Sequence, residues 1–218
     1  KVFQCAYDYS EYSYYHLISG VDLPIKSQDY IHDFFKKHAG KEFIGIAGTA
    51  SFPTINKRTN YYYPFQSSLS HVHCKGLNKY IAKIQNKFVK IQKRLNLRRT
   101  YSMELRMGPN WFSVTNGFVK YIIEHKSFLF KEFGHIFISD EIAIQSLFWN
   151  SPFRENIYSV DSQYESCQRK IDWERGMPYI WTINDIEELM SCGFIFARKF
   201  SSDNIDVVKE IEKRLAVS

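Results

Sequence analysis

The sequence has few cysteines and no long run of apolar residues. Its four cysteines, Cys5, Cys74, Cys167 and Cys192, lie far apart and form no Cys-x-x-Cys pair. Such sparse usage argues against a disulfide framework and favours reduced thiols. No apolar run approaches the ~18 residues that a membrane-spanning helix needs. We therefore expect a soluble cytoplasmic protein, free or associated with the inner face of a membrane, with no integral membrane segment.

The sequence also lacks internal repeats, low-complexity linkers and a clear metal motif. His71, His73 and Cys74 lie close together, but they lack the paired spacing of a zinc site, so no metal is expected there. The 218 residues are 44% hydrophobic and 24% charged, which is the composition of a globular protein with a core. We predict a single domain over residues 1–218. The aromatic fraction of 17% includes rings that could stack on sugars, although most rings will belong to the core.

Positive charge is concentrated in one segment. Ten basic residues and a single acid, Glu104, lie between Lys75 and Arg106, so the rest of the chain is net negative although the whole carries +6. In this segment apolar residues recur at alternating steps of four and three, which predicts a long helix. These residues are Leu77, Ile81, Ile84, Phe88, Ile91 and Leu95.

This helix has a plain interpretation and two more specific ones. We expect the apolar seam to pack against the domain, with the basic face solvated. The alternatives are a coiled-coil arm, or an anion-binding face for nucleic acid or membrane. One hypothesis for the whole protein follows from the last alternative: a non-catalytic module that binds nucleic acid or another polyanion through the basic helix of residues 75–99.

An acidic pair follows a short apolar run. Residues 136–138 predict a buried strand, Ser139 can cap a helix, and the apolar residues at 142, 143 and 147 have the helical period. Asp140 and Glu141 would then lie in the first turn of a helix at the end of a strand, where ligands of α/β sheets collect. The helix dipole there favours an ionised carboxylate, which can accept a proton. The plainer interpretation is that both are ordinary first-turn acids.

The remaining patterns predict short strands and helices along the whole chain. Ser27 is a plausible N-cap for a helix that ends before Gly40. Residues 169–179 are polar and aromatic and predict a loop. Strands are expected at residues 14–18, 42–46, 111–114 and 194–197, and helices at residues 27–38, 116–125, 182–190 and 205–215.

Four blocks of sequence resemble one known family. They are residues 15–26 (Tyr-His-Leu-Ile-Ser-Gly-Val-Asp-Leu-Pro-Ile-Lys), 107–112 (Met-Gly-Pro-Asn-Trp-Phe), 139–141 (Ser-Asp-Glu) and 196–200 (Phe-Ala-Arg-Lys-Phe). In this order they are similar to the core-2/I-branching glycosyltransferases, which include β-1,6-N-acetylglucosaminyltransferases and peptide O-xylosyltransferases. The single-domain length looks more like the bacterial branch. Each block alone is weak, whereas the ordered set is fairly specific.

The resemblance implies a GT-A-like α/β fold, with a mixed central sheet flanked by helices. It also implies that a sugar, most simply GlcNAc or xylose, passes from a UDP-sugar to an acceptor hydroxyl with inversion at the anomeric carbon. The acceptor would be a glycan, polysaccharide or glycoconjugate, and no specific nucleic acid would be involved. Inversion needs one general base, and the family's glutamate corresponds to Glu141.

The departing diphosphate needs cations or a metal. The sequence contains no Asp-x-Asp motif, and the family is similar in using basic side chains, so no metal and no other cofactor is expected. Lys199 is the first choice for this role, followed by Arg198 and Arg175. Without the resemblance, Arg198 and Lys199 would simply end a strand. The resemblance places three further residues on the donor side, namely Ser19, Gly20 and Asp22.

The acceptor side and the N-terminal part of the fold complete these expectations. Trp173 resembles an aromatic platform for the acceptor, and Trp111 and Asp140 are assigned to the same side. Family members normally carry a nucleotide-binding portion upstream of the block at residues 15–26. Only fourteen residues precede Tyr15. We therefore expect that portion to be missing from this chain, and we predict the family's activity for the complete protein.

Overall fold

The computed structural model describes residues 2–65 and 75–216, with the side chains of residues 75–77 left out. The chain forms two compact units, each built from segments that alternate along the sequence. Unit 1 comprises Lys1–Ile46, Pro109–Val119 and Glu155–Ser218, and unit 2 comprises Ala47–Gly108 and Lys120–Arg154. A single domain over residues 1–218 stays a prediction. Among the described residues, no helix combines the length and the hydropathy needed to cross a bilayer.

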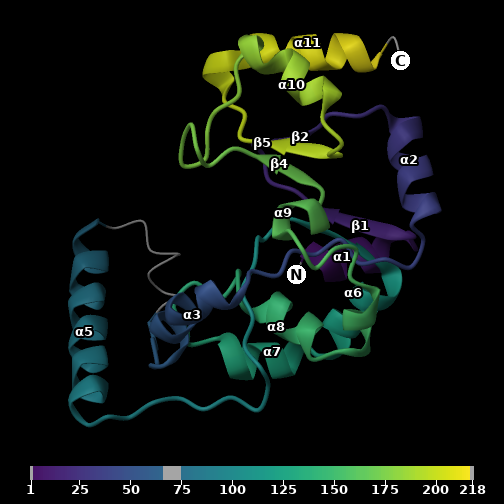
Figure 1. The fold of residues 1–218 in the computed structure, drawn as a ribbon. Coiled ribbons are helices and arrows are strands. Elements are labelled where there is room, and N and C mark those ends of the chain that lie inside the picture. Colours follow the sequence, from purple (N-terminus) through teal and green to yellow (C-terminus); the bar gives the residue numbers. More distant parts are fainter. Residues whose placement is uncertain (1, 66–74, 217–218) are drawn as a thin grey trace. The chain divides into compact units, whose positions relative to one another are not determined.

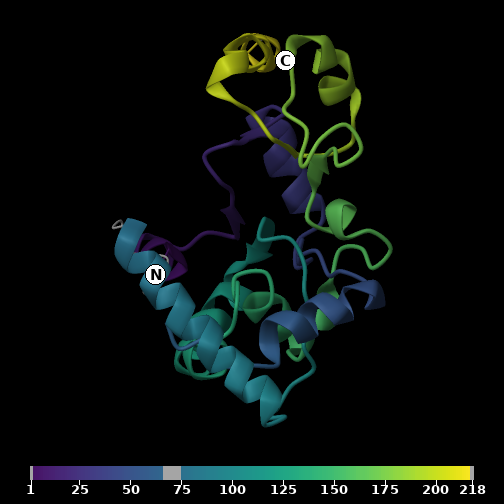
Figure 2. The same ribbon diagram turned by 90° about the vertical axis from the view of Figure 1, so that its left-hand side faces the viewer.

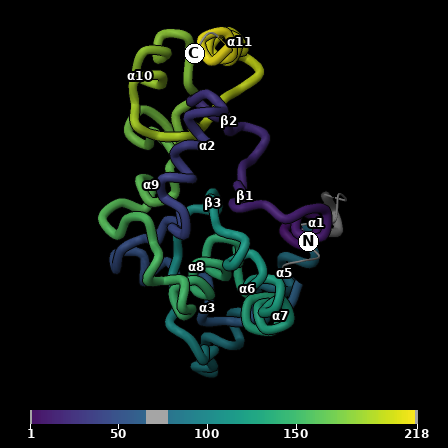
Figure 3. The backbone as a smooth tube through the Cα atoms, turned by 90° about the vertical axis from the view of Figure 1, so that its right-hand side faces the viewer, coloured from purple at the N-terminus to yellow at the C-terminus, as the bar shows by residue number. Residues whose placement is uncertain are grey.

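The first sheet of unit 1 is a pair of antiparallel strands. Strand β1 (Tyr14–Leu17) lies beside β3 (Phe112–Thr115) (Figure 3). The register places His16 opposite Ser113. Both strands were predicted to within a residue or two. The strand expected at 42–46 is wrong, since only isolated bridges form, from Glu42 to Ile157 and from Phe43 to Ser113. Neighbouring residues pair with different segments there, so no regular ladder develops.

The second sheet of unit 1 is mixed. Strand β5 (Phe196–Arg198) lies in the centre, with β2 (Asp22–Pro24) antiparallel on one side and β4 (Arg169–Ile171) parallel on the other. The register places Asp22 opposite Arg198. The expectation of a loop from residue 169 is therefore wrong at its start, because a three-residue strand is too short to show an alternating pattern.

Helices cover both sheets of unit 1. Helix α2 (Gln28–Lys37) begins after Ser27, whose hydroxyl accepts a hydrogen bond from the Tyr30 N–H, and it buries Ile31 and Phe35. Helices α10 (Ile186–Ser191) and α11 (Ile205–Leu215) lie beside the second sheet (Figure 1). With residues of β2 and β5 they form one core, which includes Trp181. A 3-10 turn, Ile183–Asp185, opens the helix predicted at 182–190. The other helices of the unit are α1 (Val2–Tyr9), α9 (Gln163–Ser166) and the start of α6 (Asn116–Glu124).

The described part of unit 2 is helical. Its core contains Phe133, Ile136 and Ile142, with Met107 and Leu129 packed against them. The described helices are α3 (Phe52–Thr59), α5 (Lys75–Arg94), the end of α6, α7 (Lys126–Phe133) and α8 (Ala143–Trp149), with 3-10 turns at Thr49–Ser51 and Pro152–Asn156.

Helix α5 forms where the sequence predicts it, but a different face packs. Its buried residues are Gln85, Val89 and Gln92. The apolar seam, expected to pack against the domain, is instead largely exposed from Ile84 to Leu95. That expectation is wrong because the glutamine side chains bond to the neighbouring backbone of unit 2 and turn their own face inward.

Candidate functional site

The predicted site residues belong to both units, so the residues of each unit are described by themselves. Asp140 and Glu141 lie in unit 2. The others lie in unit 1, namely Ser19, Gly20, Asp22, Trp111, Trp173, Arg175, Arg198 and Lys199.

Asp22 and Arg198 form the centre of the predicted residues in unit 1. They face one another across strands β2 and β5, and Arg198 Nε lies 3.5 Å from Asp22 Oδ1. Both residues are more than nine-tenths buried. A turn with Ser19 fixes the position of Asp22. The Asp22 Oδ2 atom accepts a hydrogen bond of 2.7 Å from the Ser19 N–H, and the Asp22 N–H donates to the Ser19 carbonyl. The aspartate thus has a fixed position beside the guanidinium.

Two tryptophans fix Arg198. The Trp111 ring lies against the guanidinium, with Cζ 3.3 Å from the ring centroid, which is a close cation–π contact. The Trp181 indole N–H donates to the Arg198 carbonyl over 2.7 Å. Burial lowers the pKa of the Arg198 guanidinium, while the charge of Asp22 raises it. An arginine nevertheless remains protonated at neutral pH, so a cation is held in this position.

Several buried polar atoms around Arg198 have no hydrogen-bond partner among the described residues. They are Ser19 Oγ, Asp22 Oδ1, Arg169 Nε, and both Nε and Nη1 of Arg198. Buried polar groups are normally paired, so such a cluster marks a place where a ligand could complete the bonds. Two unsatisfied donors on one buried guanidinium suit an anionic ligand with several oxygens, such as a phosphate.

Arg169 is a member of this cluster that the sequence did not reveal. It is fully buried, and it donates hydrogen bonds to the Cys167 and Leu17 carbonyls. Burial lowers the pKa of Arg169 to about 10, while Cys167 and Asp22 raise it. The segment was expected to be a polar and aromatic loop, and no local pattern marked its first residue as buried.

Lys199 and Gly20 lie next to this centre in the sequence. The Lys199 backbone follows directly after β5 and pairs with residues 179–181. Its N–H donates to the Tyr179 carbonyl, and its carbonyl accepts from the Trp181 N–H. Within the described part of the chain, the Lys199 ammonium has no ion pair or hydrogen bond. Gly20 is exposed, and a side chain there would meet no atom within 4 Å. Both roles stay predictions.

Arg175 and Trp173 lie in a loop that acidic residues hold together. The Arg175 guanidinium bonds to Asp172 at 2.5 Å, to Asp185 at 2.7 Å and to Glu188 at 2.8 Å. These contacts satisfy its positive charge and, through hydrogen bonds from Arg175, lower the pKa of Asp172. Donor binding by Arg175 stays a prediction, but the observed contacts support a structural role. Trp173 is 43% exposed, which leaves its ring accessible.

In unit 2, Glu141 lies in a turn that the sequence did not predict. The strand expected at 136–138 is wrong, since Ile136 is buried, Phe137 is exposed and Ile138 has a φ of 53°. Helix α8 begins only at Ala143, with Ile142 as its N-cap, so Asp140 and Glu141 precede the helix. The chain turns here because Ile136 and Ile142 both belong to the core around Phe133.

Glu141 is positioned by Arg58. The Arg58 Nη1 atom lies 2.5 Å from Glu141 Oε2, and the Glu141 carbonyl accepts a hydrogen bond from the Gly108 N–H. A third of the Glu141 side chain is exposed, so the carboxylate is both oriented and accessible. Asp140 is exposed. Arg58 was missed as a partner of Glu141, because the two residues lie 83 positions apart in the sequence.

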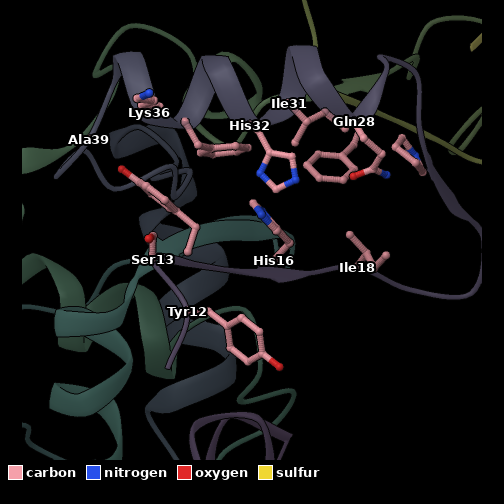
Figure 4. Close-up of a pocket in the computed structure, with 13 residues that line it drawn as sticks. Tyr12, Ser13, His16, Ile18, Gln28, Ile31, His32, Lys36 and Ala39 are labelled. Carbon is pink, nitrogen blue, oxygen red and sulfur yellow. The ribbon is translucent and has the colours of Figure 1, made fainter. Parts of the chain in front are cut away.

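Unit 1 also contains a pocket that includes none of the predicted residues. Its volume is about 760 Å³, and it lies between one face of β1 and one face of α2. The imidazoles of His16 and His32 approach one another across it, with aromatic and aliphatic side chains around them (Figure 4).

The described residues contain no group of three or more side chains suited to a metal ion. His71, His73 and Cys74, which were considered as metal ligands, lie outside the described residues.

The family model described as Core-2/I-Branching enzyme matches residues 4–189. No curated protein matches the chain. The matched range contains Asp22, Trp111 and Glu141, whereas Arg198 and Lys199 follow it. Assignment of those two cations therefore depends on the sequence block at 196–200 and on the contacts described above.

Proposed function

Since the chain belongs to the Core-2/I-Branching enzyme family, whose members are glycosyltransferases with nucleotide-sugar donors and glycan acceptors, we propose the following reaction. A sugar, GlcNAc or xylose, is transferred from a UDP-sugar to an acceptor hydroxyl with inversion at the anomeric carbon. The hydroxyl oxygen forms the new bond to this carbon, the bond to the diphosphate breaks, and UDP leaves. The hydroxyl proton goes to a carboxylate.

The observation that carries the donor half of the proposal is the buried Arg198 with two unsatisfied donors. A diphosphate leaving group develops negative charge, which fixed cations stabilise most effectively in a site that excludes water. We assign this role to Arg198 and, beside it in the sequence, to Lys199. Asp22 and Trp111 would hold the guanidinium in place, since both contact it. One face of Trp111 is thereby occupied, which favours the donor side for this residue over the predicted acceptor side.

The acceptor half of the proposal assigns the general base to Glu141. An inverting transfer needs one base, and a carboxylate is ionised at neutral pH. Arg58 fixes one oxygen of Glu141, and the exposed part of the side chain can receive the hydroxyl proton. Trp173, with its accessible ring, and Asp140 are proposed to contact the acceptor. Arginine and lysine side chains replace a metal in this proposal.

The test separates binding from chemistry. Glu141→Gln should abolish UDP release from UDP-GlcNAc or UDP-xylose in the presence of acceptor glycans, and should leave UDP affinity within about twofold, because the amide keeps the shape but cannot take a proton. Calorimetric titration with UDP, with and without a chelator, measures binding. The matched control is Glu124→Gln, an exposed glutamate on α6. Normal turnover of Glu141→Gln would disprove the assignment of the base.

A further inference from the structure

Helix α5 packs onto unit 2 through polar side chains. Gln92 Oε1 accepts from the Tyr62 N–H at 2.9 Å, and Gln92 Nε2 donates to the Tyr62 carbonyl at 3.0 Å. Gln85 Oε1 accepts from the Phe65 N–H at 3.1 Å. These bonds fix the rotation of the helix about its own axis. They therefore decide which residues of α5 point away from the unit.

The side chains turned away include an apolar stripe. Ile84 is 49% exposed, Phe88 42%, Ile91 47% and Leu95 62%. Their spacing of four, three and four residues places them in one row along the helix, about 16 Å long. Figure 2 views the molecule from the side on which α5 lies in Figure 1. A continuous apolar row on a surface marks an interaction site more often than single exposed residues do.

The stripe is bordered by positive charge. Lys87 lies three residues after Ile84 and four before Ile91, and Arg94 lies three after Ile91, so both are neighbours of the stripe on the helix surface. Helix α5 contains no acidic residue. Within the described ranges, no carboxylate forms an ion pair with a basic residue of α5.

The charge and the stripe together select one kind of partner. A second copy of the chain would bring two rows of lysines and arginines together, which is unfavourable. Nucleic acid would pair with the basic side chains but leave the apolar row in water. An anionic lipid surface meets both requirements, because apolar side chains enter the acyl boundary while lysines reach headgroup phosphates. We infer that the exposed face of α5 docks the protein onto an anionic phospholipid surface.

The experiment measures co-sedimentation with lipid vesicles. The chain should bind vesicles of phosphatidylglycerol and phosphatidylcholine in equal parts, and should bind pure phosphatidylcholine at least about tenfold more weakly. Phe88→Gln with Ile91→Gln should lower the partition coefficient at least about tenfold, because two apolar side chains no longer leave water. Lys83→Gln with Lys87→Gln should weaken binding to the anionic vesicles but should not change binding to pure phosphatidylcholine.

Matched controls come from exposed residues elsewhere. The first control, Phe130→Gln with Ile205→Gln, removes exposed apolar side chains from α7 and α11. The second, Lys37→Gln with Lys41→Gln, removes exposed charges. Both pairs should leave vesicle binding unchanged. Circular dichroism verifies folding. If the first α5 pair fails to fold, Ile84→Gln with Leu95→Gln replaces it.

Three results would overturn the inference. The first is no binding of the unmodified chain to anionic vesicles. The second is a dimer in analytical ultracentrifugation that the Phe88 and Ile91 substitutions abolish, because the partner would then be a second copy. The third is binding to generic DNA as tight as to vesicles, with loss only in the lysine variant, because α5 would then be a polyanion site.

Discussion

Glu42 is a buried carboxyl group whose protonation should make the stability of the protein depend on pH. Its side chain has no exposed surface, and its oxygens accept hydrogen bonds from the Thr115 N–H at 2.9 Å and the Thr115 hydroxyl at 2.5 Å. Burial raises the pKa of Glu42 to about 7, although the bonds from Thr115 lower it. Burial prevails because two neutral donors replace the hydration of a charge only in part.

The direction of the effect follows from linkage. The carboxyl group binds its proton more tightly in the folded state than in the unfolded state, where its pKa is about 4.5. Its contribution to stability is therefore fully present below pH 4.5 and is lost as the pH rises towards and through 7. Between pH 5 and pH 8 the free energy of unfolding should fall by about 2 to 3 kcal/mol on account of this group alone.

The substitution Glu42→Gln isolates the contribution of Glu42 to the pH dependence of stability. The amide stays neutral at all these pH values, and its oxygen can accept from the Thr115 N–H while its NH₂ group donates to the Thr115 hydroxyl. The variant should match the unmodified chain near pH 5 and exceed its stability by about 2 to 3 kcal/mol at pH 8. Urea unfolding followed by tryptophan fluorescence measures both. Exposed Glu124→Gln should change neither value.

A constant difference between Glu42→Gln and the unmodified chain across this pH range would refute the reasoning. It would show that the Glu42 carboxyl is ionised in the folded protein, with the Thr115 bonds replacing its hydration fully. All other titrating groups are common to Glu42→Gln and to the unmodified chain, so the difference between these two at each pH reports Glu42 alone.

Two further predictions concern the arginines of unit 1. Arg198→Lys should weaken UDP binding at least about tenfold in calorimetry, because an ammonium cannot make two parallel bonds to phosphate. The control Arg154→Lys removes an exposed guanidinium stacked on Trp149 and should not weaken UDP binding. If Arg198→Lys and the unmodified chain bind UDP with equal affinity, Arg198 does not belong to the donor site. Arg175→Met should lower the free energy of unfolding, because the nearly buried Asp185 loses its cation, and should leave UDP affinity within about twofold. A larger loss of affinity would restore Arg175 as a donor ligand.

Local signals in the sequence predicted the longer elements well. Ser27 and the apolar spacing that follows it gave helix α2, and the spacing at residues 205–215 gave α11 with the observed bounds. Short elements were less predictable. A strand of three residues, such as β4, shows no period, and the apolar residues at 136–138 fit a strand as well as the turn that forms. The turn results from packing among Phe133, Ile136 and Ile142, which no local pattern contains.

The candidate site was predictable only where sequence blocks mark it. Asp22, Arg198 and Glu141 came from such blocks, and the structure adds the contacts of each. Arg58, the partner of Glu141, and the buried Arg169 could not be found, because each bonds to a residue far away in the sequence. A buried arginine and a solvated one have the same local appearance. Tertiary hydrogen bonds and burial are what separate them.

Helix α5 shows what an apolar pattern determines and what it leaves open. The spacing from Ile81 to Leu95 predicts a helix and the residues that share one face. It does not say whether that face meets the same chain, because the pattern contains no information about the partner surface. The bonds of Gln85 and Gln92 with backbone groups between residues 62 and 65 decide the question here. Leaving those part-buried backbone groups unpaired would cost free energy. Exposure of the apolar stripe also costs free energy, which contact with another surface would recover.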